Sequence, residues 1–154
     1  MIRSAALIAA VLVAEAALAD SAPGPAAFAR FSDPESIVLA VTADFEAAGG
    51  AVRLAVYADE TAFLERAAAK HEARMGPDGV AVLPLKDLAP GEYAFVAYYD
   101  ANGDGKLNRG GVLGRPKEPV AFSNGVKPKL RRPRFDEAKV AVDRGAVVVL
   151  AFDD

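Results

Sequence analysis

The stretch E-Y-A-F-V-A-Y-Y at residues 92–99 decides the fold, because its apolar side chains alternate along an extended segment. Tyr93, Phe95 and Tyr99 fall on one face, which is the period of a half-buried β-strand. The polar stretch D-A-N-G-D-G-K-L-N-R-G-G at residues 100–111 follows it directly. This part of the chain therefore predicts a strand that ends in a long polar loop.

Five further segments have strand character and are separated by turn sequences. They are predicted at residues 37–45, 52–57, 80–85, 138–142 and 146–152. The glycine pair in A-A-G-G at 47–50 suits a tight reversal, so the first two strands are expected to form a hairpin. The turn D-R-G at 143–145 predicts a second hairpin at the C-terminal end. About six to seven strands without repeated helical crossovers predict a mainly β fold, an antiparallel β-sandwich.

One segment, residues 59–70, breaks the alternation and predicts a single short helix. Asp59 or Thr61 is a suitable helix cap, and Phe63 and Ala67 are spaced four residues apart. The run of three alanines that follows favours a helical backbone. The predicted fold is thus a β-sandwich with one helical insertion.

The N-terminus has the order of a secretory signal peptide. Arg3 precedes an apolar run over residues 5–14, and the small residues A-L-A at 17–19 suit the peptidase. The run is shorter than the roughly 18 residues of a membrane-spanning helix, and Glu15 interrupts it. We therefore expect cleavage after Ala19, a periplasmic or secreted location, and no transmembrane segment in the mature chain. An uncleaved anchor and a buried Ala-rich helix are the alternatives.

Three regions are expected along the chain. Residues 1–19 form the signal peptide, residues 20–35, which contain three prolines, form a flexible lead-in, and residues 36–154 form the β-sandwich domain. Removal of the signal peptide leaves 135 of the 154 residues, which is enough to bury one core.

The composition restricts the chemistry and the partners. The chain has no cysteine, which excludes disulfides, thiolate metal sites and thiol nucleophiles. A formal net charge of −3 predicts no general attraction to nucleic acid or to an anionic membrane. An envelope component of unspecified chemistry is the expected partner.

The polar loop has the residue types and spacing of a calcium-binding loop. The predicted ligands are Asp100, Asn102, Asp104 and Asn108 with the backbone carbonyl of Lys106. Gly105 stands where an EF-hand loop makes its sharp turn. The twelfth position is Gly111 instead of a bidentate Glu, and Glu118 is the nearest acid to replace it, so calcium affinity should be weak. The alternative is a Gly- and Asn-rich turn whose side chains cap their own backbone.

A second local feature is the basic run K-P-K-L-R-R-P-R at residues 127–134. Its two prolines favour an extended course. The candidates for binding lipid headgroups or another polyanion are Lys127, Lys129, Arg131, Arg132 and Arg134. The alternative is a solvated loop.

Catalytic patterns are scarce, so we expect no enzyme. The only histidine, His71, follows the predicted helix, where an exposed terminal position is its default interpretation. The sequence contains neither G-x-S-x-G nor H-E-x-x-H. The acids available to a carboxylate-based hydrolase are Glu60, Glu65, Asp136 and Glu137, and solvated surfaces explain them equally.

Four linked segments form a pattern more specific than the loop alone. They are P-G-E-Y-A-F at 90–95, Y-D-A-N-G-D-G-K-L-N at 99–108, G-R-P-K-E-P-V-A-F-S-N at 114–124 and P-R-F-D-E-A at 133–138. The pattern resembles domain-of-unknown-function family 2141, small exported bacterial proteins, over residues 36–152. The resemblance implies a periplasmic or secreted β-sandwich, prealbumin-like or carboxypeptidase regulatory-like, with no established activity.

The residues and the resemblance together predict an exported, non-enzymatic binding or structural module of the cell envelope, with a loop that weak calcium binding stabilises. A polyanion- or lipid-headgroup-binding surface at residues 127–134 and a carboxylate-based hydrolase are the alternative functions.

Overall fold

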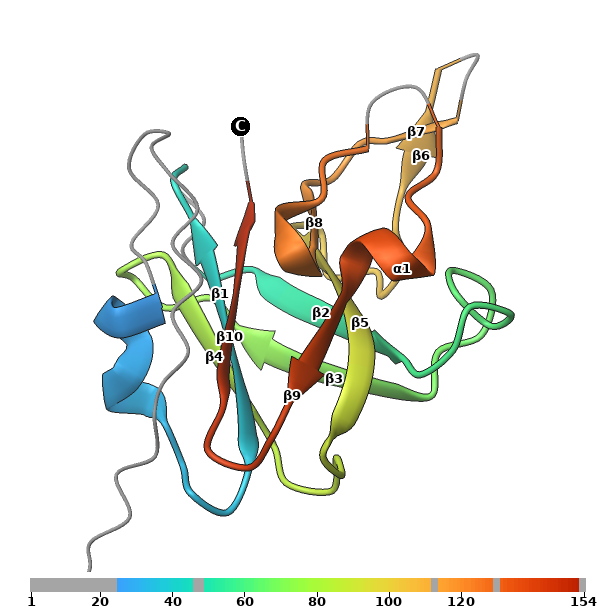
Figure 1. Ribbon diagram of the computed structural model, residues 1–154. Coiled ribbons are helices and arrows are strands. Elements are labelled where there is room, and N and C mark those ends of the chain that lie inside the picture. Colours follow the sequence, from blue (N-terminus) through green and yellow to red (C-terminus); the bar gives the residue numbers. More distant parts are fainter. Residues whose placement is uncertain (1–24, 46–48, 112–113, 129–130, 153–154) are drawn as a thin grey trace, which may run out of the picture.

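A computed structural model describes residues 25–45, 49–111, 114–128 and 131–152 (Figure 1). Two β-sheets pack face to face and enclose the apolar core, so the chain has the mainly β fold that its strand pattern predicts. The predicted signal peptide, with its cleavage site, lies outside the described residues.

The smaller of the two facing sheets has three strands in the order β10–β1–β4. They are β1 (Ile37–Ala43), β4 (Val80–Leu85) and β10 (Val147–Phe152). β1 is apolar along almost its whole length and is the central strand, antiparallel to β4 and parallel to β10. The parallel pair departs from the wholly antiparallel sandwich that we expected. It is possible because β1 and β10 are joined by the rest of the domain instead of by a short turn.

The larger sheet has five strands. They are β2 (Ala51–Tyr57), β3 (Ala69–Arg74), β5 (Gly91–Asp100), β8 (Val120–Phe122) and β9 (Lys139–Val142). The order is β3–β2–β5–β8, and β9 pairs with the N-terminal part of β5. β5 is the longest strand and pairs with three others, so the stretch with the clearest alternation organises the sheet.

The main core lies between the two sheets. β5 contributes Phe95 and Tyr99 to it, and Tyr93 packs at its edge, so these three rings lie on the core side as the alternation predicts. Tyr99 makes an edge contact with Phe152 of β10, with ring centroids 6.4 Å apart. Aromatic packing therefore joins the two sheets near one end of the sandwich.

Both predicted hairpins are wrong, because each pair of strands is divided between the two sheets. β1 and β2 lie in different sheets, and so do β9 and β10. Gly49 and Gly145 do adopt the positive φ that the turns require, 87° and 81°. A tight reversal, however, can lead either to the neighbouring strand or across to the facing sheet. β1 already has β4 and β10 on its two edges, so no edge remains for β2.

The helix predicted at residues 59–70 does not form; the segment makes turns, and its last two residues begin β3. Asp59 does act as a cap, since its Oδ1 accepts a hydrogen bond from the backbone N–H of Ala62 at 2.9 Å. The helical turn stops at Leu64, whose φ of 62° is left-handed. Pairing of β3 with β2 then outweighs the helix propensity of the alanines.

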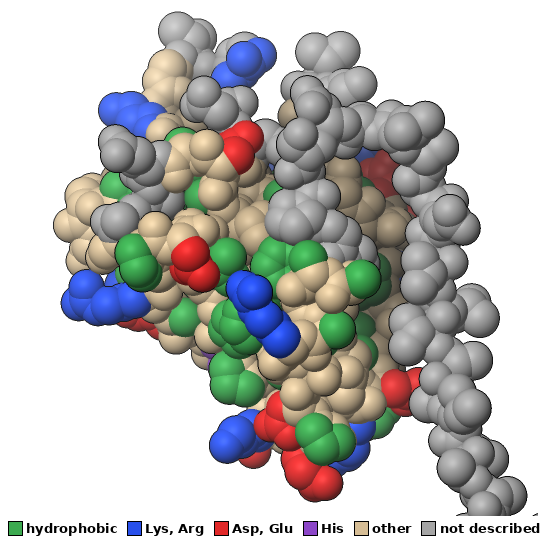
Figure 2. All heavy atoms as spheres, turned by 90° about the vertical axis from the view of Figure 1, so that its left-hand side faces the viewer, with side chains coloured by type: hydrophobic (Ala, Val, Ile, Leu, Met, Phe, Trp, Pro, Cys, Tyr) green, Lys and Arg blue, Asp and Glu red, His purple; other side chains and the backbone are tan. Residues whose placement is uncertain are grey.

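The described residues contain one short α-helix, α1 (Phe135–Ala138), and two 3-10 helices, η1 (Pro25–Phe31) and η2 (Ser123–Gly125). η1 falls in the predicted flexible lead-in, which is therefore folded from residue 25 onward. Phe28 is only 3% exposed, and η1 packs against β10 and β1, because this ring gains apolar cover there. Figure 2 views this side, where hydrophobic side chains lie among both basic and acidic ones. None of the helices in the described ranges has the length and apolarity to span a membrane.

Candidate functional site

A second apolar cluster covers the outer face of the five-stranded sheet. Its buried members are Tyr57, Phe63, Ala94, Phe122 and Ala138. Two segments cover the strands here: residues 58–68, which join β2 to β3, and the described residues 123–128 and 131–138, which contain η2 and α1 (Figure 1). Loops held on a rigid sheet are the usual place for binding residues.

Ser123 fixes the second covering segment to the sheet. Its buried hydroxyl accepts a hydrogen bond from the backbone N–H of Phe95 at 2.9 Å and donates one to the carbonyl of Ala138 at 2.5 Å. Asn124 adds a hydrogen bond from its Nδ2 to the carbonyl of Glu137 at 2.9 Å. The S-N pair at the end of β8 therefore positions α1.

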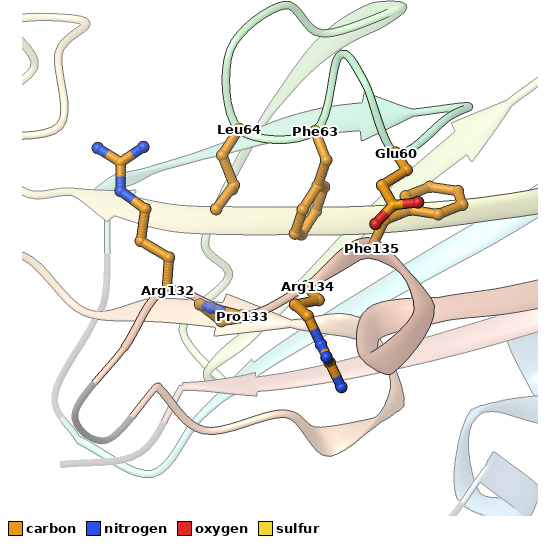
Figure 3. Close-up of a pocket in the computed structure, with 7 residues that line it drawn as sticks. All are labelled: Glu60, Phe63, Leu64, Arg132, Pro133, Arg134 and Phe135. Carbon is orange, nitrogen blue, oxygen red and sulfur yellow. The ribbon is translucent and has the colours of Figure 1, made fainter.

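An open pocket of about 210 Å³ lies between the two covering segments (Figure 3). Glu60, Phe63 and Leu64 line one side, and residues 132–135 line the other. The Phe63 ring makes edge contacts with Tyr57 and Phe135, at centroid distances of 5.3 and 5.9 Å. The pocket thus has an aromatic floor.

The predicted basic run forms one wall of this pocket, but much of its charge is compensated. Its described arginines each have an acidic partner: Arg131 with Glu137 at 2.5 Å, Arg132 with Glu65 at 3.2 Å, and Arg134 with Asp136 at 3.6 Å. Lys127 is exposed, and Lys129 lies outside the described residues. The neighbourhood is therefore a mixed surface of paired basic and acidic side chains.

Glu137 is held in its ionised form. The Arg131 guanidinium, helped by the backbone N–H of Arg134, lowers the pKa of Glu137 to about 2. A general acid in a hydrolase needs a raised pKa, so this shift has the opposite direction. Of the acids considered for a hydrolase, Glu65, Asp136 and Glu137 pair with arginines, and Glu60 lines the pocket.

Glu60 differs from these three acids because its carboxylate has no hydrogen-bond or ion-pair partner among the described residues. In Figure 3 it points toward Phe135, whereas the Arg134 guanidinium points away from Phe63 and Leu64. Glu60 is thus an exposed charge in the pocket lining without an ionic partner in the described part of the chain.

The polar loop after β5 is organised around a buried carboxylate. Oδ2 of Asp100 accepts hydrogen bonds from Nε of Arg53 at 2.7 Å and from the backbone N–H of Gly105 at 2.9 Å, and Oδ1 accepts one from Gly103 at 2.7 Å. Arg53 also contacts Glu72 at 2.7 Å. The Arg53 hydrogen bond is the main cause that lowers the pKa of Asp100, against the effect of burial. Arg53 therefore supplies the positive charge that Asp100 needs.

The other predicted calcium ligands come together around Asp104. Its Oδ2 accepts hydrogen bonds from the side-chain amides of Asn108 at 3.0 Å and Asn102 at 3.2 Å, and its Oδ1 accepts one from the backbone N–H of Lys106. Glu118 accepts the backbone N–H of Asn108 at 2.9 Å. In this arrangement the side chains cap the loop's own backbone. No three His, Asp or Glu residues gather as a metal site in the part of the chain that the structure describes.

Two short strands continue this loop, β6 (Arg109–Gly110) and β7 (Arg115–Pro116), which pair with each other. The backbone N–H of Lys117 donates to the carbonyl of Asn108 at 2.8 Å. This pairing brings Glu118 back to Asn108, at the end of the predicted calcium-binding loop. Glu118, the acid that the sequence offers as a replacement for the missing calcium ligand, thus lies beside Asn108.

Sequence reasoning missed Arg53 and the pocket residues Phe63 and Phe135. Arg53 could have been found from the sequence, since it is the one charged residue in the strand A-V-R-L-A-V-Y. A lone charge within a largely apolar strand needs a partner of opposite charge if it is to be removed from water. The sequence pattern predicts Phe63 on a helix face, whereas it lies in a turn and lines the pocket. His71, expected at a helix end, lies within β3.

The chain matches a known protein family. A family model described as an uncharacterized protein conserved in bacteria (DUF2141) matches residues 41–149. That range includes both the polar loop and the pocket. No curated protein matches the chain.

Proposed function

The chain belongs to the DUF2141 family of uncharacterised bacterial proteins, and on this premise we propose that it is an exported, non-enzymatic binding module of the cell envelope. Its ligand site is the pocket between residues 58–68 and 131–135. One observation carries this proposal: two irregular segments, fixed on a rigid sheet, leave an aromatic pocket with an unpaired carboxylate between them. Such pockets, mostly apolar with a few polar groups, are typical ligand sites.

Export is supported by the N-terminal sequence, with its basic residue, short apolar run and A-L-A site. Protein recovered from the periplasm or medium should begin at Asp20 when its N-terminal sequence or intact mass is determined. Retention of the whole chain in the cytoplasm would contradict export but would leave the pocket proposal open to its own test.

A binding role is supported over catalysis by the ionic pairing around the pocket. Glu137 is ionised and paired, and a proton donor with a raised pKa is what glycoside hydrolysis requires. Purified mature protein should therefore bind small probes at the pocket without turning over envelope substrates. Turnover that disappears on a single carboxylate substitution would establish the hydrolase instead.

The binding test is a fragment titration followed by NMR. Signals of Phe63, Leu64 and Phe135 should shift in a saturable way, and Phe135→Ala should remove the response because it removes part of the aromatic floor. Phe28→Leu, on the opposite sheet, is the matched control and should leave binding unchanged. Probes that shift only residues elsewhere would overturn the assignment of the pocket.

We also propose weak calcium binding by the loop at residues 100–108, because Asp104, Asn108 and Glu118 converge there. The affinity should be on the order of 0.1 to 1 mM, as in extracellular calcium-binding modules. Calcium would act on the stability of the loop and not on the pocket, so the two proposals can fail separately.

A further inference from the structure

We propose that the pocket binds a cationic group on an apolar stem, the chemistry of an alkylammonium ion or a lysine side chain. This inference rests on the proposed function of the pocket as a ligand site. It concerns the kind of ligand, which neither the family match nor the sequence pattern specifies.

The charges around the pocket favour a cation. Three of the seven residues that line the pocket are charged, Glu60, Arg132 and Arg134, and the two arginines pair with Glu65 and Asp136 outside the lining. Each guanidinium already contacts a carboxylate, and Glu60 is the acid left over. An ammonium group would pair with Glu60 without displacing an existing ion pair, whereas an anion would have to compete with Glu65 or Asp136 for an arginine.

The pocket walls suit an apolar stem that ends in this charge. Phe63 and Phe135 meet edge to face at 71°, and Leu64 and Pro133 complete the apolar lining. Aromatic rings attract cations as well as alkyl groups, so the floor accepts both parts of such a ligand. A volume of about 210 Å³ is below the range of roughly 300 Å³ and above that drug-sized ligands need, so it fits a group the size of one side chain.

Backbone strain at the pocket supports a ligand site at this place. Leu64 has a φ of 62°, which a bulky L-residue rarely adopts, and its side chain lines the pocket. Strain of this kind persists where the surrounding structure requires it and is concentrated at functional sites. Here it ends the helical turn and turns residues 60–64 toward the basic run.

The test is a titration of the full mature chain with n-pentylammonium, followed by NMR at Phe63, Leu64 and Phe135. Pentanol and pentanoate have the same stem with no charge and with negative charge. We expect pentylammonium to bind at least about tenfold more tightly than either, and its affinity to fall with added salt. Glu60→Gln should remove this preference, while the exposed Asp87→Asn, the matched control, should keep it.

The outcomes separate this inference from the proposed function. If pentanoate shifts the same signals more strongly than pentylammonium, or if Glu60→Gln has no effect, the cation inference is overturned and the pocket remains a ligand site. If no probe shifts these signals, both proposals fail. Nα-acetyl-lysine methylamide identifies the source: binding tighter than that of pentylammonium supports a lysine of a partner protein, and weaker binding supports a free amine.

Discussion

Two arginine–carboxylate pairs stand above the same sheet and differ in their surroundings. The Asp100 side chain is fully buried and accepts hydrogen bonds from Arg53 and from two backbone N–H groups. Arg132 and Glu65 at the pocket are 72% and 71% exposed and make one contact at 3.2 Å. Breaking a buried pair leaves an uncompensated charge, whereas an exposed pair is worth little. The polar loop is therefore built to keep one shape, while the pocket rim can adjust to a ligand.

The largest expected effect comes from the buried pair. Asp100→Asn should lower the melting temperature by about 10 °C, because Arg53 loses the buried one of its two charged partners and the loop loses the carboxylate that caps two amides. Circular dichroism measures this directly. Asp104→Asn removes an exposed carboxylate of the same loop and should cost less than half as much. Equal losses for the two variants would show that the buried position of Asp100 is unimportant.

The contrast also explains what the sequence could and could not predict. Strands such as β4 and β5 follow from local alternation, and the observed bounds agree with it closely. The ion-pair partners of a residue do not follow from the local pattern, because they lie far apart in the sequence. Arg53 and Asp100 are separated by 47 positions, and Glu65 and Arg132 by 67. For the same reason the polar cluster around Asp104, which is local in sequence, was predictable from spacing, whereas the pocket was not, since it exists only where two distant segments meet on one sheet.

Calcium should distinguish the loop from the pocket rim, since it should stabilise the loop alone. At about tenfold excess over the dissociation constant, binding to the folded state should raise the melting temperature by about 5 °C. Asp104→Ala should abolish this increment, and magnesium should give much less because it sheds water reluctantly. A melting temperature that millimolar calcium leaves unchanged would mean that D-A-N-G-D-G-K-L-N is only a turn, held by Arg53 and its own amides.

The pocket wall should respond to pH through Glu137. Its pKa is lowered from 4.5 to about 2 in the folded chain, so its contribution to stability is fully present above about pH 5 and is lost as the pH falls toward 2. Glu137→Gln should lower the melting temperature by about 4 °C at neutral pH, because α1 loses its capping carboxylate and Arg131 its partner.

The difference between wild type and Glu137→Gln should therefore shrink below about pH 4.5, as thermal melts across this range would show. Asp136→Asn, which alters a longer ion pair of the same helix, is the control and should give a smaller difference at every pH. A difference between wild type and Glu137→Gln that stays constant down to about pH 2.5 would contradict the assigned role of this ion pair.

The smallest effect on stability is expected at the exposed pair of Glu65 and Arg132, and this prediction is the most direct test of the contrast between the two pairs. Glu65→Gln should change the melting temperature by about 2 °C or less, because both side chains are already largely hydrated and their attraction is screened. The same substitution frees Arg132 at the pocket rim, so it should weaken pentylammonium binding about two- to threefold and leave the loop unaffected. Salt at about 0.5 M should remove that difference in affinity, since the added repulsion acts through solvent. A loss of stability as large as that of Asp100→Asn would mean that the rim is as rigid as the loop.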